Sequence, residues 1–297
     1  MSETEFKSAL VSILGRPNVG KSSLLNALME NELSITSGHA HTTRRSIRAI
    51  ENTPEHQIVY IDTPGIHKPI NALSDRLNDF AYDALSGVDI LVAVFDAKEG
   101  IGKGDSFVAE RIKNHPNVIA VLNKCDALKK FEKAAEQAQQ LNEMLPNAKA
   151  IIPLSAFTKK NVQILKKEII SLMPEGQPLF ATDLNHDMTD EFVVAEILRE
   201  QLLWRLRAEI PQSLAVVATE VESTKAGQRN FDVKIIVQQK SHKPIIIGKA
   251  GSMLEAAGAK AREKIEVFLD CPVYIKSKVI VDENWQDKPE SLDKYIF

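Results

Sequence analysis

Short apolar runs alternate with amphipathic stretches through the first part of the chain. Several runs are almost continuously apolar, which is typical of strands buried on both faces of a sheet. The predicted strands cover residues 8–15, 56–63, 88–97, 117–124 and 148–156. The stretches between them predict helices over residues 22–31, 73–85, 133–145 and 162–173. This alternation predicts a doubly wound, mostly parallel sheet, on which ligands bind at the carboxyl ends of the strands.

The second part of the chain has a different order of elements. Residues 173–187 combine prolines, a glycine and polar side chains, and predict a linker. Residues 191–211 predict one long amphipathic helix that ends at Pro211. Further strands are predicted at 213–222, 230–240 and 273–281, with a helix at 256–269. The order helix, strand, strand, glycine loop, helix, strand predicts a second, smaller α+β domain.

The composition is that of a globular protein. Of 297 residues, 44% are hydrophobic and 26% are charged, and no apolar run approaches the roughly 18–20 residues that span a bilayer. The polar, acidic start lacks the layout of a signal peptide. The 2 cysteines lie far apart, so neither a disulfide framework nor a zinc site is expected, and a reducing cytoplasm fits.

The charge is distributed unevenly. The net charge of −3 by itself argues against a nucleic-acid-binding protein. However, residues 234–278 hold nine Lys or Arg against four Asp or Glu, whereas residues 175–200 hold one against seven. Such a basic module can be an electrostatic footprint for nucleic acid. On charge alone, a solvated mixed-charge surface is the preferred interpretation.

A glycine-rich loop near the start, Gly15-x-x-x-x-Gly20-Lys21-Ser22, fits the phosphate-binding pattern. It follows a predicted strand and opens a predicted helix, which is the context that the pattern requires. Backbone N–H groups of the loop and the helix N-terminus attract phosphate. Lys21 would reach the β- and γ-phosphates, and Ser22 would bind Mg²⁺. The context disfavours the alternative of a chance glycine-rich turn.

Three further motifs stand at the ends of predicted strands. Asp62-Thr63-Pro64-Gly65 offers a carboxylate for Mg²⁺, through water, and an N–H for the γ-phosphate. Asn123-Lys124-Cys125-Asp126 offers one carboxylate, Asp126, that can accept both N–H donors on one edge of guanine. Ser155-Ala156 can support the base through a backbone N–H. Each motif alone is weak evidence, but their order and placement together predict a guanine-nucleotide site.

With these motifs, the first domain resembles the translation-factor-related GTPases. The resemblance implies Mg²⁺ ligands at Ser22, Thr43 and Asp62, and catalytic contributions from Lys21, Thr43 and Gly65. Thr43 belongs to HTTRR at 41–45, which resembles a switch region; Thr42 is the second choice, and an ordinary polar loop is the alternative. The implied GTP-binding residues are Gly15, Arg16, Pro17, Asn18, Val19, Gly20, Lys21, Ser22, Ser23, Asp62, Thr63, Pro64, Gly65, Asn123, Lys124, Asp126, Ser155 and Ala156.

One position departs from Ras-like enzymes. Ile66 stands where Ras has the glutamine that orients the attacking water, and an alkyl side chain cannot form that hydrogen bond. Slow intrinsic hydrolysis is therefore expected, unless backbone groups and ions take over this role. Asn18 matches a position that holds K⁺ in some relatives, so stimulation by K⁺ is one interpretation. A simple turn residue at Asn18 is the equally weighted alternative.

A second glycine loop, GKAG at 248–251, has the wrong spacing for another phosphate loop. It fits the GXXG loop of KH domains, which clamps the backbone of single-stranded nucleic acid. A lone GXXG is weak evidence, but the predicted frame and the local basic charge favour a type II KH domain. The predicted RNA-binding residues are Ile246, Ile247, Gly248, Lys249, Ala250 and Gly251.

A GTPase domain followed by one KH domain resembles the Era family of bacterial ribosome-assembly GTPases, over nearly the whole chain. The resemblance implies a P-loop GTPase domain at 6–175, a linker and the start of the KH entry helix at 176–200, a KH domain at 201–282 and a tail at 283–297. It implies binding near the 3′ end of small-subunit rRNA and a function in maturation of the 30S subunit. Two departures, the stretch before GKAG and Lys160 in place of a glycine, concern loop conformations and RNA contacts.

The same resemblance implies a cytoplasmic monomer, with peripheral contact to the inner face of the membrane as an open question. Two other classes of function remain as alternatives. One is a non-enzymatic RNA-binding adaptor with a decayed nucleotide site, which the intact Lys21, Ser22, Asp62 and Asp126 disfavour. The other is a signalling GTPase whose KH-like domain binds protein or membrane lipid.

Overall fold

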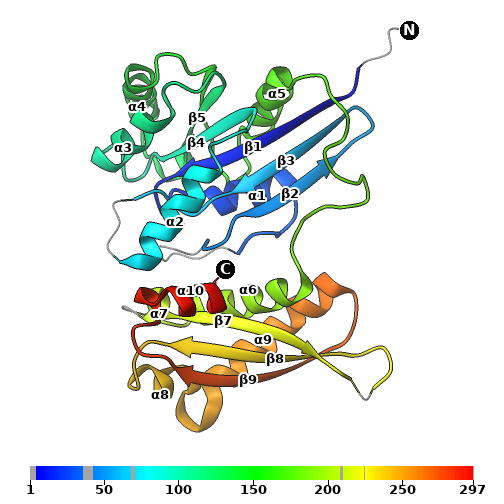
Figure 1. Cartoon of the computed structure of the whole chain (residues 1–297). Helices are drawn as coiled ribbons and strands as arrows, with labels where there is room; N and C mark the ends of the chain where they lie inside the picture. Colours follow the sequence, from blue (N-terminus) through cyan, green and yellow to red (C-terminus); the bar gives the residue numbers. More distant parts are fainter. Residues whose placement is uncertain (1–4, 36–42, 68–70, 208–209, 224, 297) are drawn as a thin grey trace. The chain divides into compact units, whose positions relative to one another are not determined.

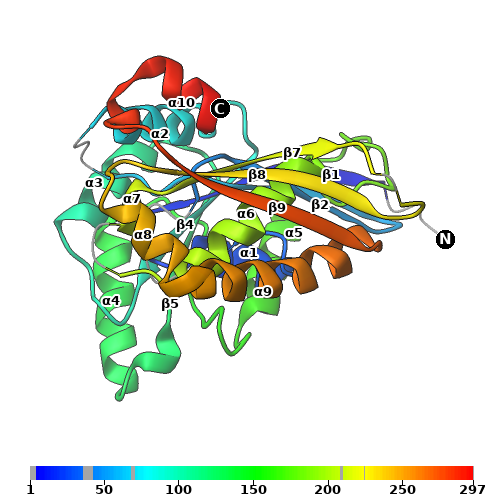
Figure 2. The ribbon, with the colours of Figure 1, turned by 90° about the horizontal axis from the view of Figure 1, so that it is seen from below.

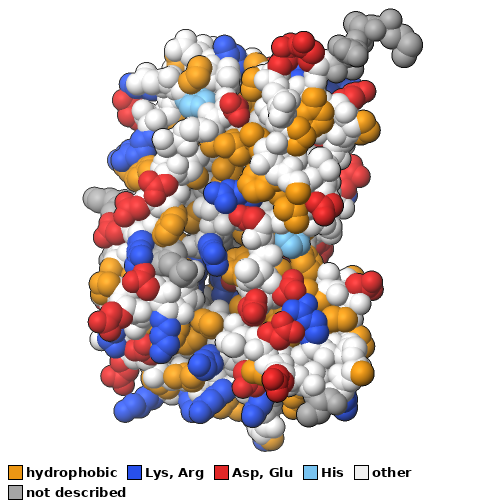
Figure 3. Space-filling view, turned by 45° about the vertical axis from the view of Figure 1, so that its right-hand side comes forward, with side chains coloured by type: hydrophobic (Ala, Val, Ile, Leu, Met, Phe, Trp, Pro, Cys, Tyr) orange, Lys and Arg blue, Asp and Glu red, His pale blue; other side chains and the backbone are white. Residues whose placement is uncertain are grey.

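The computed structural model describes residues 5–35, 43–67, 71–207, 210–223 and 225–296. They form two compact units, of which the first holds most residues up to Asp187 and the second holds Met188–Phe297 as its bulk. None of the described helices combines the length and apolar character that a bilayer crossing requires. On the face shown in Figure 3, basic and acidic side chains are interspersed.

A six-stranded sheet with the order β2-β3-β1-β4-β5-β6 is the centre of the first unit. The strands are β1 (Lys7–Gly15), β2 (Ile47–Asn52), β3 (His56–Asp62), β4 (Ile90–Asp96), β5 (Val118–Asn123) and β6 (Ala150–Pro153). All neighbouring pairs are parallel except β2 with β3. Every residue of β4 and β5 is buried, as expected for strands covered on both faces. The predicted doubly wound, mostly parallel sheet is confirmed.

Helices cover both faces of this sheet (Figure 1). They are α1 (Lys21–Met29), α2 (Ala72–Asp83), α3 (Lys103–Ile112), α4 (Phe131–Met144) and α5 (Val162–Leu172), with the short 3-10 helix η1 (Cys125–Ala127) after β5. Residues of α2, α3 and α4 pack in one apolar cluster with β1, β4 and β5. The helices α1 and α5 contact each other on the other face. Because the parallel strands end at one edge, the loops that follow them gather there.

One strand and one α-helix of the first unit are absent from the sequence prediction. One is β2, whose polar residues Arg48 and Glu51 break the apolar run that marks the other strands. It is the outermost strand of the sheet, next to β3, and on its other side it has an isolated bridge between Ala49 and His186, so only part of it is buried. The other is α3, which begins with two nearby glycines and gains a capping hydrogen bond from the N–H of Gly102 to Asp105.

The second unit is a three-stranded sheet with helices packed against it. It contains α6 (Asp190–Leu203), α7 (Ile210–Ser213), β7 (Ala215–Val221), β8 (Arg229–Val237), α8 (His242–Ile247), η2 (Lys249–Gly251), α9 (Ser252–Leu269), β9 (Val273–Val281), η3 (Trp285–Asp287) and α10 (Pro289–Tyr295). The strand order is β7-β8-β9, with β8 antiparallel to β7 and parallel to β9. Apolar side chains of α6 and α9 share one core with the three strands, and Figure 2 shows α9 along one face of the sheet.

The predicted long helix of residues 191–211 is wrong in its length. Helix α6 ends at Leu203, where the N–H of Trp204 bonds to Glu200 O and Leu202 O. After this turn, Leu206 and Ile210 pack in the same apolar core as the buried residues of α6. Pro211 lies inside the short helix α7, within its first turn, where no intrahelical N–H bond is lost.

Two segments that the sequence prediction places outside the two domains are held by side-chain contacts. Part of the expected linker is attached to the first unit: Gln57 accepts the N–H groups of Leu179 and Phe180 through its side-chain oxygen. Arg48 pairs with Asp187 at 3.2 Å. The expected tail from 283 onward is folded, because Trp285 is fully buried and its Nε1–H donates to Ser213 O at 3.0 Å.

Candidate functional site

The glycine loop after β1 positions Lys21 at the start of α1. The Nζ of Lys21 donates to the carbonyl oxygens of Arg16, at 2.9 Å, and Gly15, at 3.2 Å. Burial lowers the pKa of Lys21 to about 8, against the opposing effect of the Asp62 charge. A bound phosphate would bring further negative charge and favour the protonated lysine.

Backbone conformation explains the two glycines of this loop. Gly20 has φ +95° and its Cα faces the side chain of Asn123, so that a Cβ there would overlap the Asn123 amide. Gly15 has φ +152°, and a Cβ there would overlap the carbonyl oxygen of Val94. Asn18, the residue named for K⁺, has φ +65° and is exposed.

Three hydroxyl groups converge on one buried carboxylate. Asp62 Oδ2 accepts from Ser22 Oγ at 2.7 Å, Ser34 Oγ at 2.8 Å and Thr43 Oγ1 at 3.4 Å. Ser22 Oγ and Thr43 Oγ1 are 2.9 Å apart. The structure therefore brings together all three residues that the resemblance assigns to Mg²⁺. Thr42, the second choice, lies outside the described residues.

Only one of the two carboxylate oxygens of Asp62 accepts these hydrogen bonds. Its Oδ1 is buried and has no hydrogen-bond partner among the residues that the structure describes. Burial raises the pKa of Asp62, while the hydroxyl of Ser22 and the charge of Lys21 oppose that rise. An unpartnered buried oxygen beside two hydroxyls is the set of hard oxygen donors that Mg²⁺ prefers. In the part of the chain that the structure describes, no group of three or more His, Cys, Asp or Glu side chains could hold a metal ion.

Ser34 is a site residue that the motifs do not include. It is 4% exposed and follows α1 in a segment with little regular structure. Asn26 of α1 holds this segment, because its side-chain oxygen accepts the N–H groups of Leu33 and Ser34. A serine in a polar loop has no distinctive sequence signal, so only its spatial position identifies it.

The Asp-Thr-Pro-Gly motif packs directly on the glycine loop. The Thr63 hydroxyl donates to Ile13 O at 2.8 Å, and the Ile66 N–H donates to Gly15 O at 3.1 Å. A Cβ on Gly65 would lie 2.6 Å from the Pro17 nitrogen, so a glycine is required for this approach.

The side chain of Ile66 belongs to the core. It is 1% exposed and packs with the apolar cluster under α2 and α3. It therefore cannot contact a nucleotide or a water molecule bound at the loops. This burial gives a structural reason for the expectation that hydrolysis does not depend on this side chain.

We expect Ile66→Ala to change the rate of hydrolysis of bound GTP by less than about tenfold, or ~1.4 kcal/mol. The reason is that the hydrogen bond from its backbone N–H to the glycine loop remains. Single-turnover hydrolysis measures this rate at a temperature where circular dichroism shows the variant to be folded. A loss of many thousandfold in the folded variant would reveal a direct role for the side chain.

Asn123 links three of the motifs. Its Nδ2 donates to Val19 O at 2.9 Å, and its Oδ1 accepts the N–H of Ala156 at 3.0 Å. The Ala156 N–H, expected to support the base, is thus already hydrogen-bonded, and a base contact would have to share or replace this bond. Ser155 is buried and accepts the N–H of Thr158 through its hydroxyl.

Lys160 does not need the conformational freedom of a glycine. The left-handed conformations in this loop occur on either side of it, at Lys159 with φ +60° and Asn161 with φ +64°. The carbonyl of Lys160 accepts the N–H of Ser155 at 3.1 Å, which closes the loop.

Asp126 lies on η1 with an exposed side chain. It is the one residue of the base-recognition motif that presents a carboxylate to solvent. Lys124, two residues before it, has φ +63° and reaches back to the glycine loop, where its Nζ donates to Asn18 O at 2.5 Å. The base-recognition motif and the phosphate loop are therefore joined through protein contacts.

The Gly-Lys-Ala-Gly loop of the second unit joins α8 to α9. Gly248 has φ +77°, and a Cβ there would lie 2.7 Å from the Cβ of Met253. Ala250 has φ +51° and Gly251 has φ +86°, so the loop turns sharply with the side chains of Lys249 and Ala250 exposed.

One predicted RNA-binding side chain does not reach this surface. Ile246 is 0% exposed and lies in the core with α6 and α9, so it can only support the loop from below. Ile247 is partly buried against the same core, whereas Ile245 is 51% exposed. Within β8, residues 233–237 are also mostly buried, with Lys234 as the exposed side chain.

The fold and the loops define a two-domain protein, a P-loop GTPase domain followed by a type II KH domain. A family model described as a 50S ribosome-binding GTPase matches residues 10–124, and a KH-domain model matches residues 209–286. GTPase Era of Clostridium botulinum (strain Kyoto / Type A2) is 41% identical over 288 residues, which cover 97% of each protein. GTPase Era of Clostridium kluyveri is 39% identical, over 96% of this chain and 97% of that protein. The chain belongs to the Era family and is a GTPase.

Two solved structures are similar over the whole chain. Era in complex with MgGDPNP and nucleotides 1506–1542 of 16S ribosomal RNA has a TM-score of 0.94 and 34% identity, covering 98% of both chains. A variant of Aquifex aeolicus Era bound to GDP·AlF4⁻ has a TM-score of 0.93 and 34% identity, covering 98% of this chain and 99% of the other.

Proposed function

We propose that this GTPase is a switch that binds the 3′ end of small-subunit rRNA and assists maturation of the 30S subunit. The observation that supports this most directly is the presence of two glycine loops of different design in one chain. The first has the lysine and hydroxyl set of a nucleotide site, and the second has the exposed, sharply turned Gly-Lys-Ala-Gly of an RNA clamp. The similar Era structure with MgGDPNP and nucleotides 1506–1542 of 16S rRNA supports the same assignment.

In the nucleotide site, the glycine loop and Lys21 bind the phosphates, and Asp126 recognises guanine. Ser22, Thr43 and Asp62 would hold Mg²⁺, and Asp62 keeps one buried oxygen without a partner among the described residues for this purpose. The ion, when bound, neutralises charge on the β- and γ-phosphates. Lys21 and the Gly65 N–H stabilise the negative charge of the transferred phosphoryl group. Asn18, exposed on the loop, is a candidate K⁺ ligand, which replacement of K⁺ by Na⁺ in a hydrolysis assay would test.

In the RNA site, the backbone of residues 248–251 approaches the phosphates and Lys249 adds positive charge. The two glycines permit this approach because they carry no side chain on the turn. Ile245 and Ile247 border the loop on the α8 side, where their exposed surface is available to bases. Sequence preference would then come from these side chains, because phosphate contacts carry no sequence information.

We place the protein in the cytoplasm as a monomer. Peripheral contact with the membrane would make the KH domain a lipid-binding module instead. Flotation with anionic phospholipid vesicles, compared with binding to single-stranded RNA, separates these two partners.

We expect the double variant Lys249→Asp with Ala250→Asp to bind single-stranded RNA at least tenfold more weakly, or about 1.4 kcal/mol. The new carboxylates repel the RNA phosphates, while both glycines and the loop conformation remain. GTP binding should not change, since the nucleotide site is in the other unit. Filter binding with an oligonucleotide of the 16S rRNA 3′ end measures the RNA affinity. The parent's affinity should also fall as salt rises, with a slope near −0.7 per phosphate contact.

A matched control is available on α9. Ala259→Asp with Lys260→Asp makes the same change of charge on an exposed helix face roughly 14 Å further along the axis. This variant should lose much less affinity than the loop variant. Equal RNA binding by the parent and the loop variant would show that GKAG is only a helix-entry turn, and the proposed RNA function would fail.

A further inference from the structure

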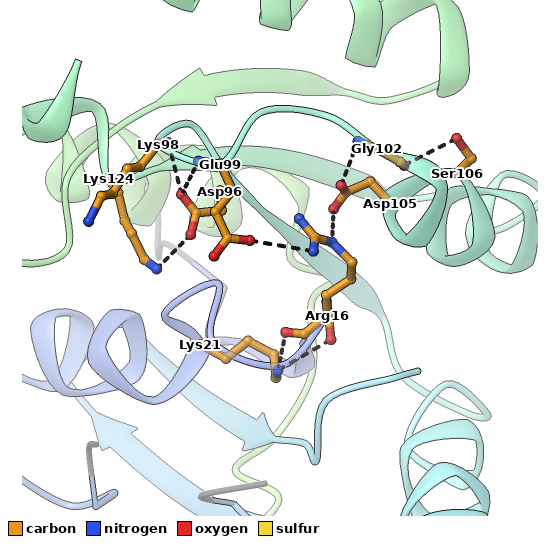
Figure 4. Close-up of polar contacts among 10 residues, drawn as sticks. Arg16, Lys21, Asp96, Lys98, Glu99, Gly102, Asp105, Ser106 and Lys124 are labelled. Atoms are coloured by element: carbon orange, nitrogen blue, oxygen red, sulfur yellow. Dashed lines mark hydrogen bonds and ion pairs between the residues drawn. The ribbon is translucent and has the colours of Figure 1, made fainter. Parts of the chain in front are cut away.

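The end of β4 and the start of α3 belong to none of the nucleotide-binding motifs. Each nevertheless carries a buried carboxylate that contacts a residue of those motifs. Asp96 ends β4 and Asp105 lies in the first turn of α3, and each is 1% exposed. A buried carboxylate is costly unless it is paired and hydrogen-bonded. The partners of these two residues therefore indicate why the chain retains them (Figure 4).

Asp96 uses both oxygens. Its Oδ2 pairs with Lys124 Nζ at 2.6 Å. Its Oδ1 accepts the backbone N–H groups of Lys98 at 2.8 Å and Glu99 at 3.2 Å, which fixes the orientation of the carboxylate. Since Lys124 Nζ also donates to Asn18 O, the lysine is held between β4 and the glycine loop, two residues before Asp126.

Asp105 divides its oxygens in a similar way. Its Oδ1 accepts from Arg16 Nε at 2.7 Å, and its Oδ2 accepts the N–H of Gly102 at 2.9 Å and so caps α3. Glu99 lies 3.6 Å from Arg16 Nη1. Gly104 leaves space for the Arg16 side chain, because a Cβ on Gly104 would overlap Arg16 Cδ.

The side chain of Arg16 therefore anchors the glycine loop to α3. Figure 4 shows its guanidinium at α3, while its main-chain carbonyl faces Lys21. The GTP-binding role implied for Arg16 consequently applies to its backbone, not to its side chain. The ion pair with Asp105 fixes one of the first residues of the loop that must surround the phosphates.

We propose that Asp96 and Asp105 are positioning residues of the nucleotide site, which hold Lys124 and Arg16 in the arrangement that retains guanine nucleotide. This inference rests on the nucleotide site proposed above. Without Asp96, Lys124 samples other rotamers, and the affinity falls by the fraction of time that it is misplaced. Without Asp105, the loop loses its anchor on α3. Both effects accelerate release of the nucleotide.

The test is the dissociation rate of a fluorescent GDP derivative, displaced by excess GDP. Asp96→Asn and Asp105→Asn keep the shape but turn an amide NH2 toward Lys124 or Arg16, or toward the backbone N–H groups. We expect each to release GDP at least tenfold faster, as the loss of a charge-assisted hydrogen bond allows. Asp89→Asn is the matched control, since Asp89 also accepts a backbone N–H, from Leu10, at the opposite end of β4.

A double-mutant cycle separates positioning from a general structural effect. In a Lys124→Met background, Asp96→Asn should cause no further acceleration, and in an Arg16→Met background neither should Asp105→Asn. Release within twofold of the parent by both Asp→Asn variants, or full acceleration in the Met backgrounds, would overturn the inference. If one variant does not fold, the other pair decides. A parent that does not prefer guanine over adenine nucleotides would instead contradict the proposed site itself.

Discussion

Asp126→Asn should lower the affinity for GTP by roughly two to four powers of ten and shift preference to xanthine nucleotides. A carboxylate on η1 can accept both N–H groups of the guanine edge, and the loss of one charged hydrogen bond costs ~1.5–3 kcal/mol. Two such losses amount to ~3–6 kcal/mol, which gives that range of affinities. Xanthine has a carbonyl in place of the 2-amino group, so it complements the amide of the variant. The side chain of Asp126 is exposed, so its carboxylate is accessible to a base.

Competition between GTP and XTP for a fluorescent guanine nucleotide measures the switch. Asp232→Asn is a suitable control, because it removes the same charge from an exposed position of β8 in the other unit. This control should bind GTP as the parent does. If Asp126→Asn retained tight GTP binding and did not respond to XTP, the assignment of base recognition to Asp126 would be wrong.

Trp285→Ala should destabilise the KH unit by about 3–5 kcal/mol, the usual cost of truncating a large buried aromatic side chain. Trp285 is fully buried, its ring meets Tyr295 edge-on with centroids 6.1 Å apart, and its indole N–H donates to Ser213 O. The substitution leaves a cavity and removes the donor from a buried carbonyl. The segment around Trp285 is therefore a structural part of the KH domain.

The other tryptophan is the natural control for this measurement. Trp204 is 62% exposed, and Trp204→Ala should change the free energy of unfolding by less than about 0.5 kcal/mol. Urea unfolding followed by circular dichroism gives the midpoint of each transition, analysed separately for the two units because a two-domain protein is not two-state. A midpoint for Trp285→Ala equal to that of Trp204→Ala would show that the last residues contribute little to the fold.

The sequence alone predicts the sheet of the first unit because its central strands are buried on both faces. Runs such as β4 and β5 are too short for typical helices and too apolar for surface strands, and the motifs that follow them must then meet at one edge. The same pattern fails for β2, which lies at the edge of the sheet and needs few apolar residues. It fails for α3 because glycines and polar residues occupy its first turn. Two of them, Gly104 and Asp105, contact the side chain of Arg16, which is distant in the sequence.

Local sequence determined the family, the doubly wound sheet, the type II KH frame and the order of the nucleotide-binding motifs. These features depend on periodicity and on short spacings, which neighbouring residues specify among themselves. Tertiary structure alone decided the end of α6 at Leu203, the folded state of the segment around Trp285, and the burial of Ile246 and Ile66. It also brought Ser34, Asp96 and Asp105 to the nucleotide motifs. Each of these depends on contacts between residues far apart in the chain, for which a single polar or apolar residue gives no sequence signal.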